Sequence, residues 1–213
     1  MKRIFLIGDS IRMGYDKYVK EALADVAEVY YPEENSRFAE YVLRYAHTWK
    51  SQLNIPDDID LVHWNAGLWD VLELFGDAPL TSLDYYGEAI ARIDKRLRML
   101  FPKAKMVFAT STAVIEGKAK EFVRHNAIIE RYNEKAKEAL SGTGTVINDL
   151  YALTSRLPES YHSDATHYYT PEATELIGGR VLAYICRETG IEAKDVNIES
   201  FEPEKYTSDN IGG

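Results

Sequence analysis

The sequence predicts an α/β protein whose parallel sheet is covered by helices on both faces. Short apolar runs alternate along the chain with longer segments in which apolar residues recur about every 3.6 positions, as on one face of a helix. The first run, residues 2–7, is rich in branched side chains and is typical of a strand buried on both faces. This alternation predicts parallel strands joined by right-handed crossovers.

Five strands and five helices are expected. The strands are expected at residues 2–7, 26–31, 60–65, 105–110 and 145–148. The helical faces are expected within residues 11–26, 38–49, 89–100, 122–140 and 171–188. The last helix has a clear start signal, because Thr170 can cap it, Pro171 suits its first position and Glu172 suits its dipole.

One domain accounts for nearly the whole chain. The 213 residues suffice for one sizeable core, and neither an internal repeat nor a linker interrupts the pattern. We assign residues 1–190 to this domain. Residues 191–213 are polar, acidic and without periodicity, so we expect them to form an irregular C-terminal tail.

The composition argues against several classes of partner. A net charge of −9 argues against nucleic acid. No stretch approaches the roughly 20 apolar residues of a spanning helix, so no membrane insertion is expected. The N-terminal apolar run is shorter than the roughly 7–15 residues of a signal peptide core, and the single cysteine, Cys186, allows no internal disulfide. We therefore expect a cytoplasmic protein that acts on a small molecule.

A serine follows the first strand directly. The turn reads Gly8-Asp9-Ser10, and a serine between a strand and a helix lies at the edge of the sheet where doubly wound folds bind ligands. Ser10 can act there as a nucleophile, and its backbone N–H can stabilise an oxyanion. Alternatively, Asp9 or Ser10 is only the N-cap of the following helix.

Two further sites near strand ends carry polar residues with catalytic potential. Asn65 closes the third strand, and its amide can stabilise an oxyanion or simply form a turn. Asp164 lies three residues before His167 and just ahead of the last helix, so its carboxylate can orient the imidazole. An isolated Asp-x-x-His pair is common by chance. Together with Ser10 and Asn65 at the same edge of the sheet, the pair indicates a catalytic site.

These motifs resemble three of the four sequence blocks of the SGNH hydrolases, also called GDSL-like lipases/acylhydrolases. The blocks are Gly8-Asp9-Ser10, Asn65 with Gly67-Leu68, and Asp164-x-x-His167, in the family's order, and the resemblance extends to about Glu188. It implies a flavodoxin-like, three-layer α/β/α sandwich with a five-stranded sheet in the order 2-1-3-4-5. It also implies ester hydrolysis through an acyl-enzyme, without a metal ion or cofactor.

The resemblance also assigns roles to residues. Ser10 would attack the ester, His167 would remove and return the proton, and Asp164 would orient His167. The backbone N–H of Ser10 and the side chain of Asn65 would hold the oxyanion.

The loop after the second strand departs from the family pattern. The family's second block has a glycine whose N–H also binds the oxyanion, whereas this loop reads Pro32-Glu33-Glu34-Asn35-Ser36-Arg37. A backbone N–H does not require glycine, so Ser36 is the expected third donor and Arg37 is the alternative. Asn35 could instead cap the next helix.

Four residues are expected to contact the substrate: Asp9, Arg37, Trp69 and Thr110. Arg37 could bind a carboxylate or hydroxyl group, and an exposed Trp69 could stack on a sugar ring. Thr110 follows the fourth strand and so faces the same edge, although such residues also form ordinary turns.

These features favour a serine esterase that removes short O-acyl groups, O-acetyl groups in particular, from a carbohydrate-like substrate. A lysophospholipase or thioesterase is the alternative within the same chemistry. The alternative without catalysis is a binding module on the same fold. The sequence has no phosphate loop of the Gly-x-x-x-x-Gly-Lys type, no zinc-binding His-Glu-x-x-His and no Gly-x-Ser-x-Gly elbow.

Overall fold

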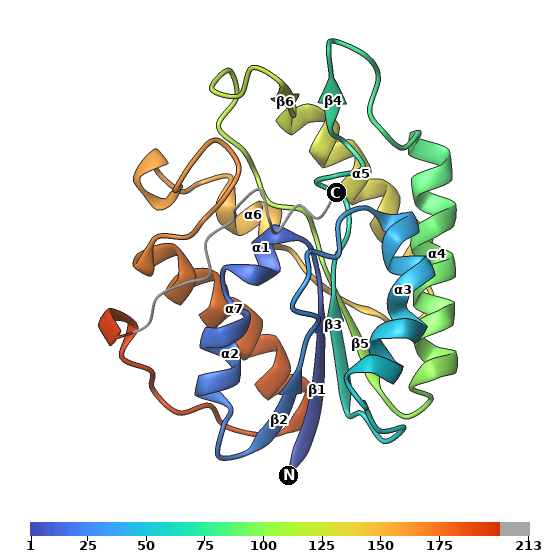
Figure 1. The fold of residues 1–213 in the computed structure, drawn as a ribbon, viewed down its shortest axis with the longest axis vertical. Helices are drawn as coiled ribbons and strands as arrows, with labels where there is room; N and C mark the ends of the chain where they lie inside the picture. Colours follow the sequence, from blue (N-terminus) through green and yellow to red (C-terminus); the bar gives the residue numbers. More distant parts are fainter. Residues whose placement is uncertain (201–213) are drawn as a thin grey trace.

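The computed structural model describes residues 1–200 as a three-layer α/β/α sandwich (Figure 1). The main sheet consists of the parallel strands β1 (Lys2–Ile7), β2 (Ala27–Tyr30), β3 (Leu61–Trp64), β5 (Lys105–Ala109) and β7 (Val146–Asn148). Their order is β2-β1-β3-β5-β7. Because β5 and β7 are the fourth and fifth expected strands, the predicted fold class and the predicted order 2-1-3-4-5 are confirmed.

Helices cover both faces of this sheet. The helices α2 (Asp16–Ala22) and α7 (Pro171–Thr189) pack together on one face. On the other face lie α3 (Ala39–Gln52), α4 (Leu83–Leu100) and α5 (Asn126–Leu140) (Figure 1). The start of α7 is as predicted, because the Thr170 side chain accepts a hydrogen bond from the Ala173 N–H and Pro171 is the first helical residue.

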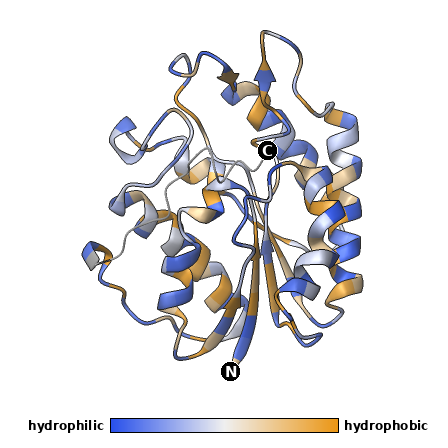
Figure 2. Cartoon of the chain, in the orientation of Figure 1, coloured by the Kyte–Doolittle hydropathy of each residue, from blue (hydrophilic) through white to orange (hydrophobic). Residues whose placement is uncertain are grey.

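The strands form the centre of the core because their side chains are apolar on both faces. Ile4, Phe5, Leu6 and Ile7 of β1 are completely buried. Figure 2 shows apolar residues along the central strands and more polar residues on the outer surfaces of the helices. This pattern is the one expected for a parallel sheet with both faces covered.

The first expected helix is broken in two at Gly14. The short α1 (Ser10–Met13) ends there and α2 begins at Asp16. A Cβ atom on Gly14 would lie 2.7 Å from the Tyr169 ring, and the Gly14 carbonyl accepts a hydrogen bond from Thr174 at 3.1 Å. The chain therefore bends where the segment that leads into α7 packs closely against it.

A small antiparallel pair of strands was not predicted. The strand β4 (Glu73–Leu74) pairs with β6 (Phe122–Val123), so that Leu74 lies opposite Phe122. The expectation that Phe122 lies on the fourth helix is wrong, because α5 begins only at Asn126. Two residues per strand are too few to show an alternating pattern in the sequence.

The chain also contains several short helical segments and the first part of the expected tail. The helix α6 (Leu150–Thr154) and the 3₁₀ turns η1 (Glu159–Tyr161) and η2 (Ile198–Ser200) were not predicted. Residues 191–197 of the expected tail have no regular secondary structure, and residues 201–213 lie outside the described residues. In the part of the chain that is described, no helix has the length and apolar character needed to cross a membrane.

Candidate active site

The turn after β1 places Ser10 at the carboxyl edge of the sheet. The Asp9 carboxylate accepts a hydrogen bond from the Ile11 N–H at 3.0 Å and so caps α1. Ser10 is the first residue of that helix, and no hydrogen bond within residues 1–200 uses its backbone N–H. Because Asp9 provides the cap, the Ser10 side chain is not needed for it.

The buried side chain of Arg12 holds this turn in place. Its guanidinium forms an ion pair with Asp16, and both side chains are completely buried. It also donates hydrogen bonds to the carbonyls of Glu34 at 2.7 Å and Gly8 at 3.4 Å. A buried charge is tolerated only with such partners. The hydrogen bond from Arg12 to the Glu34 carbonyl connects α1 to the loop after β2.

Ser10, His167 and Asp164 form a hydrogen-bonded chain. The Ser10 Oγ lies 2.8 Å from the His167 Nε2, and the His167 Nδ1 lies 2.7 Å from the Asp164 Oδ2. One ring nitrogen therefore faces the serine and the other faces the carboxylate, which is the arrangement of a serine-hydrolase triad. The serine and the histidine are 157 positions apart in the sequence.

The surroundings of Asp164 keep its carboxylate ionised. Partial burial would raise its pKa, but the hydrogen bond and charge of His167 act in the opposite direction. The backbone N–H groups of Thr166 and His167 also donate to Asp164 Oδ1, at 2.7 and 2.8 Å. The net effect holds the pKa of Asp164 well below its ordinary value. A negative charge is therefore available to stabilise an imidazolium at His167.

Tyr169 supports both members of the serine–histidine pair, and sequence reasoning did not identify it. Its ring stacks on the imidazole of His167 with 5.0 Å between centroids, and its hydroxyl donates to the Ser10 carbonyl at 2.6 Å. The only signal in the sequence is an aromatic residue two positions after the histidine. That signal does not show where the ring packs.

Asn65 lies beside the nucleophile turn because β1 and β3 are neighbours. Ile7 pairs with Trp64, and the Asn65 N–H donates to the Ile7 carbonyl at 3.0 Å. The Asn65 Oδ1 is buried against Gly8, where an added Cβ atom would lie only 2.1 Å from it. The amide NH2 group therefore points away from Gly8, as a donor to an oxyanion requires.

Ser36 is not placed as the third oxyanion donor, which corrects the prediction. Its backbone N–H donates to the Gly8 carbonyl at 3.1 Å. The alternative, the Arg37 N–H, donates to the Asn35 Oδ1 at 2.8 Å. Both amides are thus used within the protein. Arg37 has a φ of 50°, in the left-handed region that glycine adopts without strain.

Asp9 is not a substrate contact, because its side chain is completely buried and caps α1. Burial raises its pKa, and the hydrogen bond from the Ile11 N–H together with the nearby Asn65 amide only partly opposes this effect. Asp9 therefore belongs to the support of the site and does not face a ligand.

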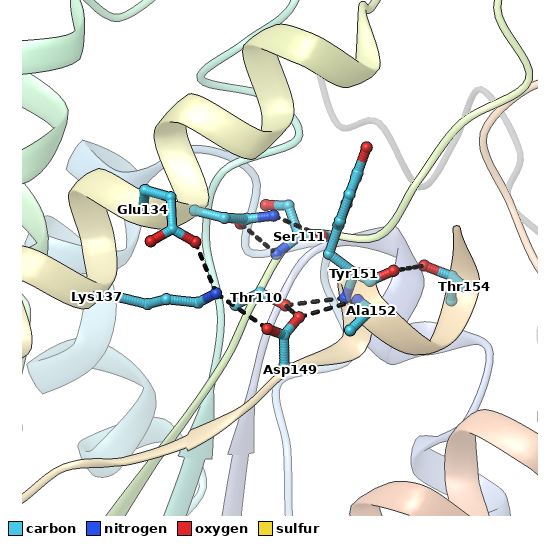
Figure 3. Close-up of polar contacts among 9 residues, drawn as sticks. Thr110, Ser111, Glu134, Lys137, Asp149, Tyr151, Ala152 and Thr154 are labelled. Atoms are coloured by element: carbon cyan, nitrogen blue, oxygen red, sulfur yellow. Dashed lines mark hydrogen bonds and ion pairs between the residues drawn. The ribbon is translucent and has the colours of Figure 1, made fainter. Parts of the chain in front are cut away.

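Thr110 is also not a substrate contact. It is only 1% exposed, and its hydroxyl donates to Asp149 at 3.1 Å while accepting the Tyr151 N–H at 2.9 Å (Figure 3). Asp149 in turn caps α6 through the Ala152 N–H and pairs with Lys137 at 2.9 Å. The ordinary turn role applies: Thr110 organises the start of α6.

A pocket of about 220 Å³ opens beside Ser10 and His167. Trp69 lines this pocket. Arg37 does not, because its guanidinium lies 4.7 Å from the ring centre of Tyr41 instead, so its expected substrate contact is not supported. Sequence reasoning missed three other lining residues that lie in or next to the β4–β6 pair: Leu72, Phe122 and Arg124.

Asp70 is another buried carboxyl group near the site. Its oxygens accept the N–H of Ala39, the first residue of α3, at 3.0 and 3.3 Å. Burial raises the pKa of Asp70 to about 7, and the nearby charge of Asp9 adds to this effect, although hydrogen bonds oppose it. Asp70 thus ties the loop after β3 to the start of α3.

No metal site accompanies these residues. Within residues 1–200, His, Cys, Asp and Glu side chains form no group of three or more that could hold a metal ion.

Comparisons with known proteins reveal similarity in structure. No protein-family model and no curated protein matches the sequence. The lipase/acylhydrolase from Enterococcus faecalis superposes with a TM-score of 0.70 at 18% identity, over 92% of this chain and 100% of that one. The acetyl xylan esterase AlAXEase superposes with a TM-score of 0.67 at 15% identity, over 86% and 99%. A candidate SGNH hydrolase from Slackia heliotrinireducens gives 0.62 at 16% identity, over 84% and 96%. The chain therefore has the fold of these proteins, which is the fold that its motifs imply.

Replacing Asp70 by asparagine should change how stability depends on pH. The unfolded pKa of aspartate is about 3.9, whereas the folded pKa is about 7. Between these values the folded protein holds a proton that the unfolded chain has lost, so stability falls as pH rises, by up to about 1.4 kcal/mol per pH unit. Asp70→Asn should remove this fall, measured as the free energy of unfolding in urea from pH 5 to 8.

The control for this experiment is Asp84→Asn, because the Asp84 side chain is almost fully exposed. It should leave the pH dependence as in the wild type. The prediction would be contradicted if the free energies of unfolding of Asp70→Asn and the wild type differed by the same amount at every pH.

Proposed function

We propose that this chain is a serine ester hydrolase of the SGNH type that works through an acyl-enzyme. The observation that carries the proposal is the hydrogen-bonded chain from the Ser10 Oγ through His167 to Asp164, at the edge of a pocket. The fold shared with a lipase/acylhydrolase and an acetyl xylan esterase supports the same reaction class.

In the first half of the reaction, Ser10 becomes acylated. Its Oγ attacks the carbonyl carbon of the ester while the His167 Nε2 takes the hydroxyl proton, and Asp164 stabilises the resulting imidazolium. The carbonyl oxygen becomes an oxyanion, which accepts hydrogen bonds from the Ser10 N–H and the Asn65 amide. When the intermediate collapses, the bond to the alcohol breaks and the alcohol leaves with the proton from His167.

In the second half, water releases the acyl group. His167 removes a proton from the water, whose oxygen attacks the acyl carbonyl, and the same two donors hold the second oxyanion. The bond to the Ser10 Oγ then breaks, and His167 returns the proton to that oxygen. The carboxylic acid leaves, and the enzyme regains its initial protonation state.

Short acyl groups on a carbohydrate-like alcohol are the proposed substrates. A pocket of about 220 Å³ is smaller than the roughly 300–1,000 Å³ that drug-sized ligands occupy, so it favours a short chain over a fatty acyl chain. Trp69, which is partly exposed in this pocket, provides an aromatic face for a sugar ring.

Reaction with a fluorophosphonate probe tests the nucleophile. The wild type should be labelled and Ser10→Ala should not, because only a serine activated by a neighbouring base attacks the phosphorus readily. Ser111→Ala is the matched control, since Ser111 also follows a strand at this edge, but its backbone bonds to the Asn133 side chain and the hydroxyl next to His167 is that of Ser10. Equal labelling of Ser10→Ala, or none of the wild type, would favour the non-catalytic binding module.

Substitution of Asn65 tests the oxyanion donor. Asn65→Ala should lower kcat by roughly 10²-fold with little change in KM, because one donor to the oxyanion is lost. Asn65→Asp, which keeps the shape of the side chain and adds a negative charge, should lower kcat further. Kinetics on 4-nitrophenyl acetate, with thermal denaturation to check folding, provide the readout. A loss of only a few-fold would leave Asn65 as a turn residue.

A series of acyl chain lengths tests the substrate class. The value of kcat/KM should fall in the order 4-nitrophenyl acetate, octanoate and palmitate, since the longer chains exceed the pocket beside Ser10. Faster hydrolysis of the long chains would instead support a lysophospholipase or long-chain thioesterase.

A further inference from the structure

The pocket beside Ser10 contains one permanently charged cation. Among the described residues that line it, Arg124 is the only arginine or lysine. Arg124 follows β6, so it belongs to the wall of the pocket formed around the β4–β6 pair and not to the segments that carry the triad.

The guanidinium of Arg124 has a fixed position. Its Nε donates to the Leu68 carbonyl at 2.6 Å, and Leu68 lies in the loop that begins with Asn65. The charge of Arg124 also lowers the pKa of Asp9, although less than burial raises it. The cation therefore acts within electrostatic range of the nucleophile turn.

The remaining walls make this charge effective. Trp69, Leu72 and Phe122 provide apolar surface, and interactions between charges are stronger beside such low-dielectric walls than in bulk water. Among the described residues that line the pocket, Asp164 has the only carboxylate, and it is hydrogen-bonded to His167 and to two backbone amides. The pocket thus combines apolar walls with a cation that can attract an anionic group of a ligand.

We propose that Arg124 selects esters that carry an additional anionic group, such as a carboxylate, on either the acid or the alcohol part. Arginine suits this role because its planar group can donate two parallel hydrogen bonds to a carboxylate, sulfate or phosphate. The inference rests on the proposed function and narrows its substrate class. In an acylated acidic sugar, the anionic group could bind Arg124 and the sugar ring could pack on Trp69.

Binding to an inactive chain tests the inference without depending on turnover. Dissociation constants would be measured by calorimetry for Ser10→Ala, alone and combined with Arg124→Gln, Arg124→Lys or the exposed control Arg92→Gln. One pair of ligands places the anion on the acid part: 4-nitrophenyl hydrogen adipate and neutral 4-nitrophenyl hexanoate. The other pair places it on the alcohol part: 4-acetoxybenzoate and its neutral methyl ester.

The expected result is a preference for the anionic member of at least one pair. Arg124→Gln should reduce this preference roughly tenfold or more, the size of a charge-assisted hydrogen bond. Arg124→Lys should retain part of it and Arg92→Gln all of it. The preference should also weaken as salt is added. The pair that responds identifies the part of the ester that faces Arg124.

The inference is overturned if, for both ligand pairs, the preference for the anionic member is the same in Ser10→Ala with Arg124→Gln as in Ser10→Ala alone. It is also overturned if charged and neutral ligands lose affinity equally, because Arg124 would then serve only to hold Leu68. Failure of the proposed function is recognised separately, by absence of fluorophosphonate labelling and ester turnover in the chain that retains Ser10.

Discussion

The pairing of β1 with β3 is the constraint on which the candidate active site depends. Ile7 lies opposite Trp64, so the residues that follow them, Gly8 and Asn65, become neighbours at the carboxyl edge of the sheet. Because side chains alternate between the faces of a strand, a shift of one residue would turn Asn65 to the wrong face. The absence of a side chain at Gly8 then lets the Asn65 amide pack directly beside the turn that carries Ser10.

Buried polar groups around this junction hold the site in place. Asp9 caps α1, Asp70 binds the start of α3, and Arg12 connects α1 to the loop after β2. Each of these groups would be costly to bury alone, and each is given specific partners by the fold. They act on the geometry of the site and not on the ligand.

The residues proposed for catalysis and those proposed for substrate recognition come from different parts of the chain. Ser10 and His167 lie at the start of α1 and ahead of α7, whereas the lining residues Leu72, Phe122 and Arg124 come from segments around β4 and β6. This small pair of strands packs outside the main sheet, so its residues can vary without disturbing the strand register. In the proposed function, the wall that carries Arg124 would set specificity while the triad geometry stays the same.

The resemblance to the SGNH hydrolases implied the strand order. The sequence by itself determined the layers and the candidates Ser10, Asn65, Asp164 and His167. These features are readable because helix and strand periods are local, and because parallel strands bring their carboxyl ends to one edge. The sequence could not separate Asp9 and Thr110, which are buried in caps and turns, from residues that face a ligand. It also gave no signal that the Ser36 N–H is bonded to Gly8, or that Tyr169 and Arg124 reach the site. Only the tertiary structure decided these points, because they depend on contacts between residues far apart in the sequence, which no local pattern records.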